Sequence, residues 1–261
     1  YLLLMKIKFY KYHGTGNDFI LIDNRSLFFD KSNVNFISKI CNRNIGVGAD
    51  GLILLENHEN LDFKMIYFNS DGKETSMCGN GGRCIVSFAK KLNVIKDKAK
   101  FMAIDGPHAS FIDNGLVSLQ MNQVNLIDNI EGGYVLDTGS PHFVKFCNSI
   151  NELDVVKKGR EIRNEKKISN NGINVNFVEV INNNCIKVRT YERGVENETL
   201  SCGTGVVASV LSAFKKGFVN ENKIKIITLG GDLHVSFNFN NPNFENIWLE
   251  GPAVQVFKGK I

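Results

Sequence analysis

The chain has 261 residues, of which 43% are hydrophobic and 22% are charged. This composition is typical of globular proteins and excludes disordered, collagen-like and coiled-coil chains. The net charge is only +4 and no long block of like charges occurs, so we expect no nucleic-acid partner. No apolar run approaches the roughly 20 residues that a membrane span needs, so we also expect no membrane partner.

Secondary structure can be predicted from hydrophobic periodicity along the chain. Short runs rich in β-branched and aromatic residues predict strands over 6–12, 19–23, 52–55, 63–68, 117–121, 143–146, 175–180, 186–191, 224–228, 233–239 and 247–249. Helices are expected over 33–43, 82–92 and 206–214. The last of these is apolar nearly all round, so other elements must enclose it.

The chain resembles itself at a spacing of 124 residues, the distance between Cys78 and Cys202, which each begin a Cys-Gly-x-Gly motif. When 67–91 is aligned with 191–215, nine of the 25 pairs are identical. About one or two would be expected by chance. We therefore predict an α/β (α+β) fold of two pseudo-symmetric domains, each a curved, mainly antiparallel sheet or barrel around a central helix. The expected domains are 5–126 and 127–251, with a crossover near 122–131.

Both repeated cysteines stand directly before a Gly-x-Gly turn that leads into a predicted helix. Unpaired backbone N–H groups and the positive end of the helix dipole favour a thiolate at that place and can also bind a carboxylate. The other cysteines are expected to be small buried hydrophobes; they are Cys41, Cys84, Cys147 and Cys185. None of the six cysteines has a spacing typical of zinc ligands, so we expect no metal site. Because the cysteines are scattered along the chain, we expect a reducing, cytoplasmic location.

Two such thiols could serve three chemistries. A redox pair is one, although the two cysteines lack the adjacent spacing of a redox loop. A single nucleophilic cysteine with a histidine base is another, but it leaves the second thiol unexplained. Proton transfer at a stereocentre needs one acid/base group on each face of a planar carbanion. Inversion of an α-carbon therefore explains the duplication best.

The motifs taken together resemble those of the diaminopimelate epimerase family. They are the runs 12–19 (YHGTGNDF), 46–51 (GVGADG), 68–72 (FNSDG), 77–84 (MCGNGGRC), 139–142 (GSPH), 191–194 (YERG) and 201–205 (SCGTG). They extend over nearly the whole chain. The resemblance implies conversion of LL-2,6-diaminopimelate to the meso isomer without a cofactor. It also implies two domains that close over a small amino-acid substrate, with the tail 252–261 returning to the first domain.

The resemblance also implies roles for individual residues. Cys78 and Cys202 would be the acid/base pair, and His142 and Glu192 would tune their pKa values. The positions that match substrate contacts are Asn17, Asn69, Gly79, Asn80, Asn174, Glu192, Arg193, Gly203 and Thr204. An arginine fork suits a carboxylate, and asparagines can bind both ends of an amino acid without adding charge.

Some positions depart from the family pattern. Gly51 and Ser140 replace a glutamine and an asparagine of some members, and one extra residue lies between Glu192 and Cys202. Phe257 replaces a tyrosine that some relatives use at a dimer contact, which leaves a homodimer open. Two alternatives remain: a proline or hydroxyproline racemase, whose usual histidine would stand where this chain has Asn80, and a non-catalytic redox or metal-binding thiol protein.

Overall fold

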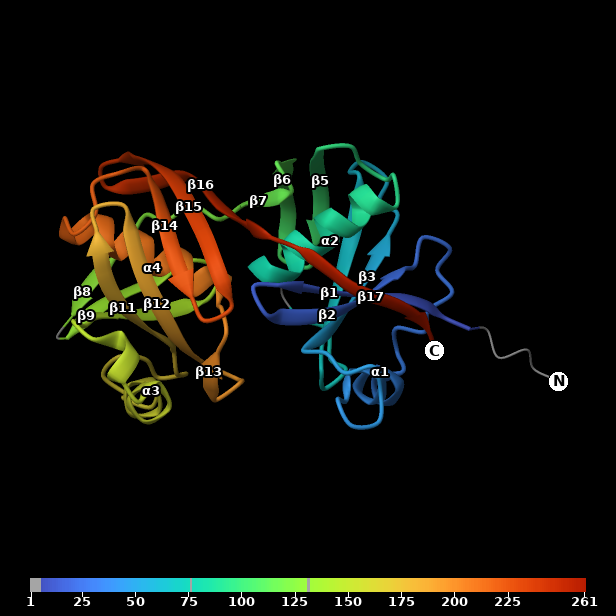
Figure 1. The fold of residues 1–261 in the computed structure, drawn as a ribbon, viewed down its shortest axis with the longest axis horizontal. Helices are drawn as coiled ribbons and strands as arrows, with labels where there is room; N and C mark the ends of the chain where they lie inside the picture. Colours follow the sequence, from blue (N-terminus) through green and yellow to red (C-terminus); the bar gives the residue numbers. More distant parts are fainter. Residues whose placement is uncertain (1–5, 76, 131) are drawn as a thin grey trace. The chain divides into compact units, whose positions relative to one another are not determined.

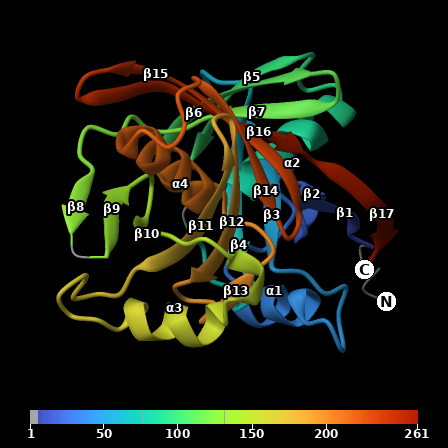
Figure 2. The same ribbon diagram turned by 60° about the vertical axis from the view of Figure 1, so that its left-hand side comes forward.

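The computed structural model describes residues 6–75, 77–130 and 132–261. Its internal contacts divide the chain into two compact units (Figures 1 and 2). The first unit contains the residues up to Leu119 together with Pro252–Ile261, and the second contains Gln120–Gly251. Among the described residues, no helix combines the length and the apolar character that crossing a membrane would require.

The first unit is a mixed, mainly antiparallel sheet with two helices. Its strands are β1 (Lys8–Gly14), β2 (Asn17–Asp23), β3 (Gly51–Glu56), β4 (Phe63–Asn69), β5 (Lys98–Ala103), β6 (Gly106–Asp113), β7 (Leu116–Gln120) and β17 (Val254–Lys260). The strand pairs β2–β3 and β4–β5 are parallel, and the pairs β17–β1, β1–β2, β3–β4, β5–β6 and β6–β7 are antiparallel. Its helices are α1 (Val34–Cys41) and α2 (Gly79–Lys91).

The second unit is built in the same order. Its strands are β8 (Asp128–Ile130), β9 (Gly133–Asp137), β10 (Pro141–Phe146), β11 (Asn174–Asn182), β12 (Cys185–Glu192), β13 (Asn197–Thr199), β14 (Lys223–Thr228), β15 (Gly231–Asn240) and β16 (Asn243–Pro252). The pairs β10–β11 and β12–β14 are parallel, and the remaining pairs are antiparallel. A 3₁₀ turn (Ile150–Glu152), α3 (Val155–Arg163) and α4 (Gly203–Lys216) complete the unit.

The predicted pseudo-symmetric α/β fold is confirmed, and one pair of equivalent strands has the same register in both units. Phe19 faces Gly51 across the parallel pair β2–β3, and Phe143 faces Val175, each 124 residues further on, across β10–β11. One register differs between the units. Gly51 faces Asn69, whereas Val175 faces Tyr191, two residues short of the position that the repeat predicts. A slip of two residues keeps every side chain on its own face of the sheet, so the cores are preserved.

Each unit has one helix deep in its core. In α4 every residue from Gly205 to Ala213 is buried, and the helix lies among the strands of its unit, as its apolar sequence predicts (Figure 1). In α2 the buried residues run from Gly79 to Val86 and include Phe88 and Ala89. Both helices begin three residues earlier than predicted, at Gly79 and Gly203. The glycine-rich tripeptide after each cysteine is therefore the first helical turn and not a turn before the helix.

Several elements were missed by the sequence prediction for identifiable reasons. The sequence of α3 contains Gly159, which normally weakens a helix interior. A Cβ at Gly159 would lie 2.3 Å from the Cβ of Tyr191, so this glycine allows α3 to pack closely against β12. The strand β17 exposes most of its apolar residues and so lacks the usual amphipathic pattern. The strand β5 does alternate exposed and buried residues, but its lysines and alanines have low strand propensity. Their positions follow from pairing with β4 and β1, which local periodicity does not encode.

Candidate active site

Cys78 is the N-cap residue of α2. Its sulfur accepts a hydrogen bond from the backbone N–H of Gly81 at 3.2 Å, and its backbone is extended, with φ −104° and ψ 146°. The first intrahelical bond is donated by Gly82 to the Cys78 carbonyl. The N–H groups of Gly79 and Asn80 therefore lie in the first turn of the helix, at the positive end of its dipole. This end of α2 can bind an anion and stabilise a thiolate.

Two asparagine side chains lie beside Cys78. The Asn17 Oδ1 atom is 3.9 Å from the Cys78 sulfur and accepts a hydrogen bond from Asn80 Nδ2 at 3.3 Å. The Asn17 Nδ2 atom donates to Asp50 Oδ2 at 2.6 Å. Because Asp50 can only accept, this bond fixes which end of the Asn17 amide faces the cysteine. The structure thus brings Asn17, Asn80 and Cys78 together, as the motifs imply.

A charged cluster holds Asp50 in place. The Arg43 guanidinium donates to Asp50 Oδ1 at 2.8 Å and binds both carboxylate oxygens of Asp18, at 2.7 and 3.0 Å. Lys11 pairs with Asp18 at 2.7 Å. Although burial opposes it, hydrogen bonding to Arg43 and Lys11 lowers the pKa of Asp18 well below its usual range. Asp18 therefore stays ionised at neutral pH, and its bonds to Arg43 hold the partner of Asn17 in place.

Arg83 lies one turn into α2 and is completely buried. Its guanidinium donates to Asn80 Oδ1 at 2.8 Å, to Thr15 Oγ1 at 3.3 Å and to the carbonyl oxygens of Gly79 and Pro252 at 3.2 and 3.5 Å. Burial lowers its pKa to about 10, partly offset by the neighbouring cysteines, so the group remains charged at neutral pH. A buried positive charge therefore lies next to the start of α2.

Cys202 is the corresponding N-cap residue of α4, with φ −116° and ψ 111°. Its sulfur is buried and lies 3.5 Å from the hydroxyl of Thr204. The Thr138 hydroxyl donates to the carbonyl oxygen of Thr204 at 2.9 Å and so attaches the first turn of α4 to the segment after β9. The N–H groups of Gly203 and Thr204 lie in that first turn, as those of Gly79 and Asn80 do in α2.

His142 lies on β10, is 0% exposed, and contacts the same first turn. Its Nε2 atom is 2.9 Å from Thr204 Oγ1 and 3.0 Å from Ser140 Oγ, and these two hydroxyls are 3.2 Å apart. Burial, followed by the charge of Arg193, lowers the pKa of His142 to about 3. The imidazole is therefore neutral at physiological pH. The structure connects His142 to Cys202 through Thr204, which the sequence did not indicate.

Asn174 and Arg193 lie next to this cluster. The buried Asn174 amide donates to Ser140 Oγ at 3.2 Å and to the Pro141 carbonyl at 3.3 Å, and its Oδ1 accepts from the backbone N–H of Arg193 at 2.8 Å. The Arg193 guanidinium donates to the Gly172 carbonyl at 3.3 Å. Glu192 is the last residue of β12 and is half-buried.

Asn69 has a different setting from the other predicted residues. It is the last residue of β4 and is exposed, while its backbone forms a turn with Gly72 and Lys73. Its predicted contact with substrate stays a prediction. Among the polar residues to which sequence reasoning assigned no role are Asp50, Arg83 and Asn176. The first two stand inside the motifs, but only burial and hydrogen bonding reveal what they support.

The remaining cysteines are set apart from this chemistry by burial. Cys41, Cys84 and Cys185 are at most 8% exposed, and Cys147 is half-buried. Burial raises the pKa of all four thiols, for Cys41 to about 12. They therefore stay protonated at neutral pH, as expected for small core residues.

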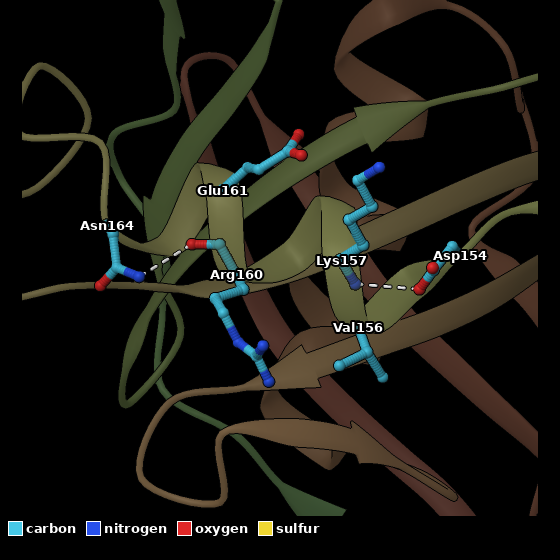
Figure 3. A pocket seen from close by; sticks show the side chains of 6 residues that line it. All are labelled: Asp154, Val156, Lys157, Arg160, Glu161 and Asn164. Atoms are coloured by element: carbon cyan, nitrogen blue, oxygen red, sulfur yellow. Dashed lines mark hydrogen bonds between the residues drawn. The ribbon is translucent and has the colours of Figure 1, made fainter.

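A surface hollow of about 520 Å³ lies along α3 (Figure 3). Two of its polar residues cap the two ends of the helix: the Asp154 side chain accepts from the N–H of Lys157, and the Asn164 side chain donates to the Arg160 carbonyl, both at 2.9 Å. Val156 and Glu161 complete its lining. None of the predicted site residues lines this hollow, so it is separate from the candidate site.

The chain is similar to known proteins over nearly its whole length. The family model described as diaminopimelate epimerase matches residues 9–125 and 134–256. A diaminopimelate epimerase of Flavobacterium psychrophilum is 52% identical over 98% of this chain and 100% of its own length. One of Chlorobaculum tepidum is 40% identical over 95% of this chain and 98% of its own length.

Solved structures show the same fold at low sequence identity. A phenazine biosynthesis protein of the PhzF family from Bacillus anthracis is similar with a TM-score of 0.76 and 14% identity, covering 99% of both chains. A hydroxyproline epimerase from Agrobacterium vitis is similar with a TM-score of 0.70 and 12% identity, covering 99% of this chain and 93% of its own. The sequence relatives and the family model, which together cover nearly the whole chain, show that it belongs to the diaminopimelate epimerase family.

Proposed function

We propose that the chain converts LL-2,6-diaminopimelate to the meso isomer by proton transfer at one α-carbon, without a cofactor. Cys78 and Cys202 are the acid/base pair in this proposal. The observation that carries it is that a cysteine forms the N-cap of the central helix in each unit of a chain belonging to this family. Duplicated thiols of this kind suit a reaction that must approach one carbon from two sides.

The proton transfer balances without a further reactant. One cysteine, as thiolate, removes the α-hydrogen as a proton, and the electron pair of the broken C–H bond remains on the substrate. The other cysteine, as thiol, gives its proton to the opposite face of that carbon. The first cysteine ends as a thiol and the second as a thiolate, so the roles are exchanged for the reverse reaction.

The polar groups around the cysteines suit a substrate with two amino-acid ends. In each unit the start of the central helix suits a carboxylate, at Gly79 and Asn80 in one and at Gly203 and Thr204 in the other. Arg193 and Glu192 supply a positive and a negative group at the end of β12 for the remaining end of the substrate. Asn17, Asn69 and Asn174 can bind carboxylate or ammonium groups without changing the charge balance.

We also propose a cytoplasmic location, because six scattered cysteines suit a reducing compartment. The proposed domains are 5–126, to which the tail 252–261 returns, and 127–251. A homodimer is a further proposal, which light scattering on the purified protein tests directly. A mass twice that of the 29.2 kDa chain would support the dimer, and a mass equal to it would refute it.

The proposed activity is tested with protein purified without pyridoxal phosphate and kept reduced. LL-diaminopimelate is incubated with the protein, and the stereoisomers are separated by chiral chromatography. We expect conversion to the meso isomer and no change of L-proline or trans-4-hydroxy-L-proline under the same conditions. Racemisation of proline with unchanged diaminopimelate would favour the racemase alternative and refute the proposal.

A further inference from the structure

The imidazole of His142 has a buried partner at each ring nitrogen. On one side, Nε2 lies near the hydroxyls of Thr204 and Ser140. On the other side, Nδ1 lies 3.0 Å from the side-chain nitrogen of Asn176, a β11 residue with 0% exposure. Asn176 has no part in the motifs and no role in the proposed function. Its position raises the question of which ring nitrogen carries the proton.

The orientation of the Asn176 amide answers that question. Its Nδ2 atom is 3.2 Å from the carbonyl oxygen of Phe143, and its Oδ1 atom is 2.9 Å from the Thr190 hydroxyl. The reversed amide would place an oxygen against the Phe143 carbonyl, and two acceptors would then face each other inside the core. The second hydrogen of Nδ2 therefore points at His142 Nδ1, which must accept it and carry no proton.

This tautomer allows a chain of hydrogen bonds in which each group donates to the next one toward Cys202. With Nδ1 accepting, the ring proton of neutral His142 is on Nε2, which can donate to Thr204 Oγ1 at 2.9 Å, the nearer of its two hydroxyl neighbours. A hydroxyl that accepts one hydrogen bond can use its own hydrogen for another. Thr204 can therefore donate to the sulfur of Cys202 at 3.5 Å. Such a donor stabilises a thiolate.

The second glycine of the Cys-Gly-x-Gly motif is what allows this arrangement. A Cβ on Gly205 would lie 2.2 Å from Asn176 Oδ1 and 3.3 Å from His142 Cε1. The first turn of α4 can therefore approach the Asn176–His142 pair only with glycine at this position. Burial and the positive charge of Arg193 both disfavour an additional proton on the ring, in agreement with a neutral imidazole.

We propose that Asn176 is a positioning residue that holds His142 as the neutral tautomer with its proton on Nε2, so that His142 donates to Thr204 and Thr204 donates to Cys202. This inference rests on the proposed function where it assigns Cys202 to proton transfer. The tautomer itself does not depend on the reaction, so the two can fail separately.

The tautomer is measured by two-bond ¹H–¹⁵N NMR on protein labelled with ¹⁵N-histidine. The chain has five histidines, and the His142 signals are identified by their loss in His142→Gln. We expect an unprotonated Nδ1 and a protonated Nε2 from about pH 5 to about pH 9. A proton on Nδ1 anywhere in that range overturns the proposal, whether or not the protein epimerises diaminopimelate.

The isosteric variant Asn176→Asp tests the relay. Its carboxylate can only accept, so it should draw the proton to His142 Nδ1 and reverse the direction of donation. We expect kcat to fall about tenfold or more with KM changed less than about threefold, and the pH dependence of kcat to shift. The control is Asn182→Asp on the same strand, which is exposed and uses only its Oδ1, as an acceptor from the N–H of Asn184. It should leave both the NMR signals and kcat unchanged.

Two outcomes of the Asn176→Asp experiment contradict the proposal. If the His142 proton stays on Nε2, Asn176 does not set the tautomer. If the tautomer changes while kcat and its pH dependence match those of the parent, the tautomer has no bearing on Cys202. Should Asn176→Asp fail to fold, the NMR measurement on the parent protein still decides whether the Nε2–H tautomer exists.

Discussion

The two cysteines occupy equivalent helix starts, but the groups that support them differ. Beside Cys78 lies a buried guanidinium, that of Arg83, whereas Cys202 is approached by the neutral imidazole of His142 through Thr204. At the spacing of the repeat, Arg83 corresponds to Val207 in α4. The second unit therefore has no arginine at the position that Arg83 occupies in the first. The backbone setting of the thiol was kept in both halves, while its electrostatic surroundings diverged.

Two halves of a repeat can therefore keep the same backbone position for a thiol while different charged and polar groups surround it. The charge of Arg83, whose pKa is lowered only to about 10, stabilises an anion throughout the neutral range. A neutral hydrogen-bond donor does so only while the histidine keeps its tautomer. We therefore expect the two halves to respond differently to substitution and to pH. The following predictions test that contrast.

The largest effect should come from removing either sulfur. If both cysteines transfer protons, Cys78→Ala and Cys202→Ala should each lower the rate of epimerisation by about 10³-fold or more. Cys147→Ala serves as control, because that thiol is half-buried and lies outside both helix starts, and its rate should stay near that of the parent. Parent-like epimerisation by either of the first two variants would show that only one half acts.

Removal of the charge beside Cys78 should mainly affect stability and thiol reactivity. Arg83→Met removes the guanidinium that donates to Asn80, Gly79 and Thr15, and we expect a loss of about 3 kcal/mol in the free energy of unfolding in urea. Alkylation of Cys78 at neutral pH should also slow. The control Arg25→Met breaks a partly exposed ion pair with Asp23 and should cost less than about 1 kcal/mol. Equal costs would contradict the assigned role of Arg83.

The second unit should be the more sensitive to acid. Burial lowers the pKa of His142 from its ordinary 6.5 to about 3, so between these values the unfolded chain binds a proton that the folded chain does not. The stability contributed by neutral His142 is therefore present above about pH 6.5 and is lost as the pH falls toward 3. His142→Gln should remove about 2 kcal/mol of the difference in unfolding free energy between pH 7 and pH 5. An unchanged difference would mean that His142 titrates normally.

The smallest effect distinguishes the two motif glycines. A Cβ on Gly205 would overlap Asn176 Oδ1 at 2.2 Å, whereas one on Gly81 would meet side-chain atoms of Ile53, Cys78 and Met65 at 3.1 to 3.4 Å. Gly205→Ala should therefore cost about 1–2 kcal/mol more than Gly81→Ala in urea unfolding. If Gly81→Ala proved the more costly, the close approach assigned to the second unit would be wrong.

The repeat and most strands were predictable because identical residues and alternating apolar residues can be recognised in the sequence itself. Cys78 and Cys202, with identical flanking residues, reveal the duplication, and alternation of apolar residues reveals most strands. The helix over Val155–Arg163 was not predictable, because Gly159 is explained only by the packing of Tyr191 against it.

The motif residues of the candidate site were predictable, but the buried residues that hold them in place were not. The position of each cysteine at a helix start follows from the Gly-x-Gly sequence after it. That Arg83 is completely buried, or that Asn176 faces His142, depends on contacts between strands and helices distant in sequence. Likewise, an asparagine-rich chain gives no signal that distinguishes Asn176 from Asn182 on the same strand.

The central claim, that two different groups act on opposite faces of one carbon, is tested most directly by isotope distribution. The reaction of LL-diaminopimelate is run in deuterated water and stopped at low conversion, and both isomers are analysed by mass spectrometry and NMR. With two bases, the meso product carries solvent deuterium at the inverted carbon while the recovered LL isomer carries none. A product that retains the substrate's own hydrogen, or equal labelling of both isomers, would contradict the account.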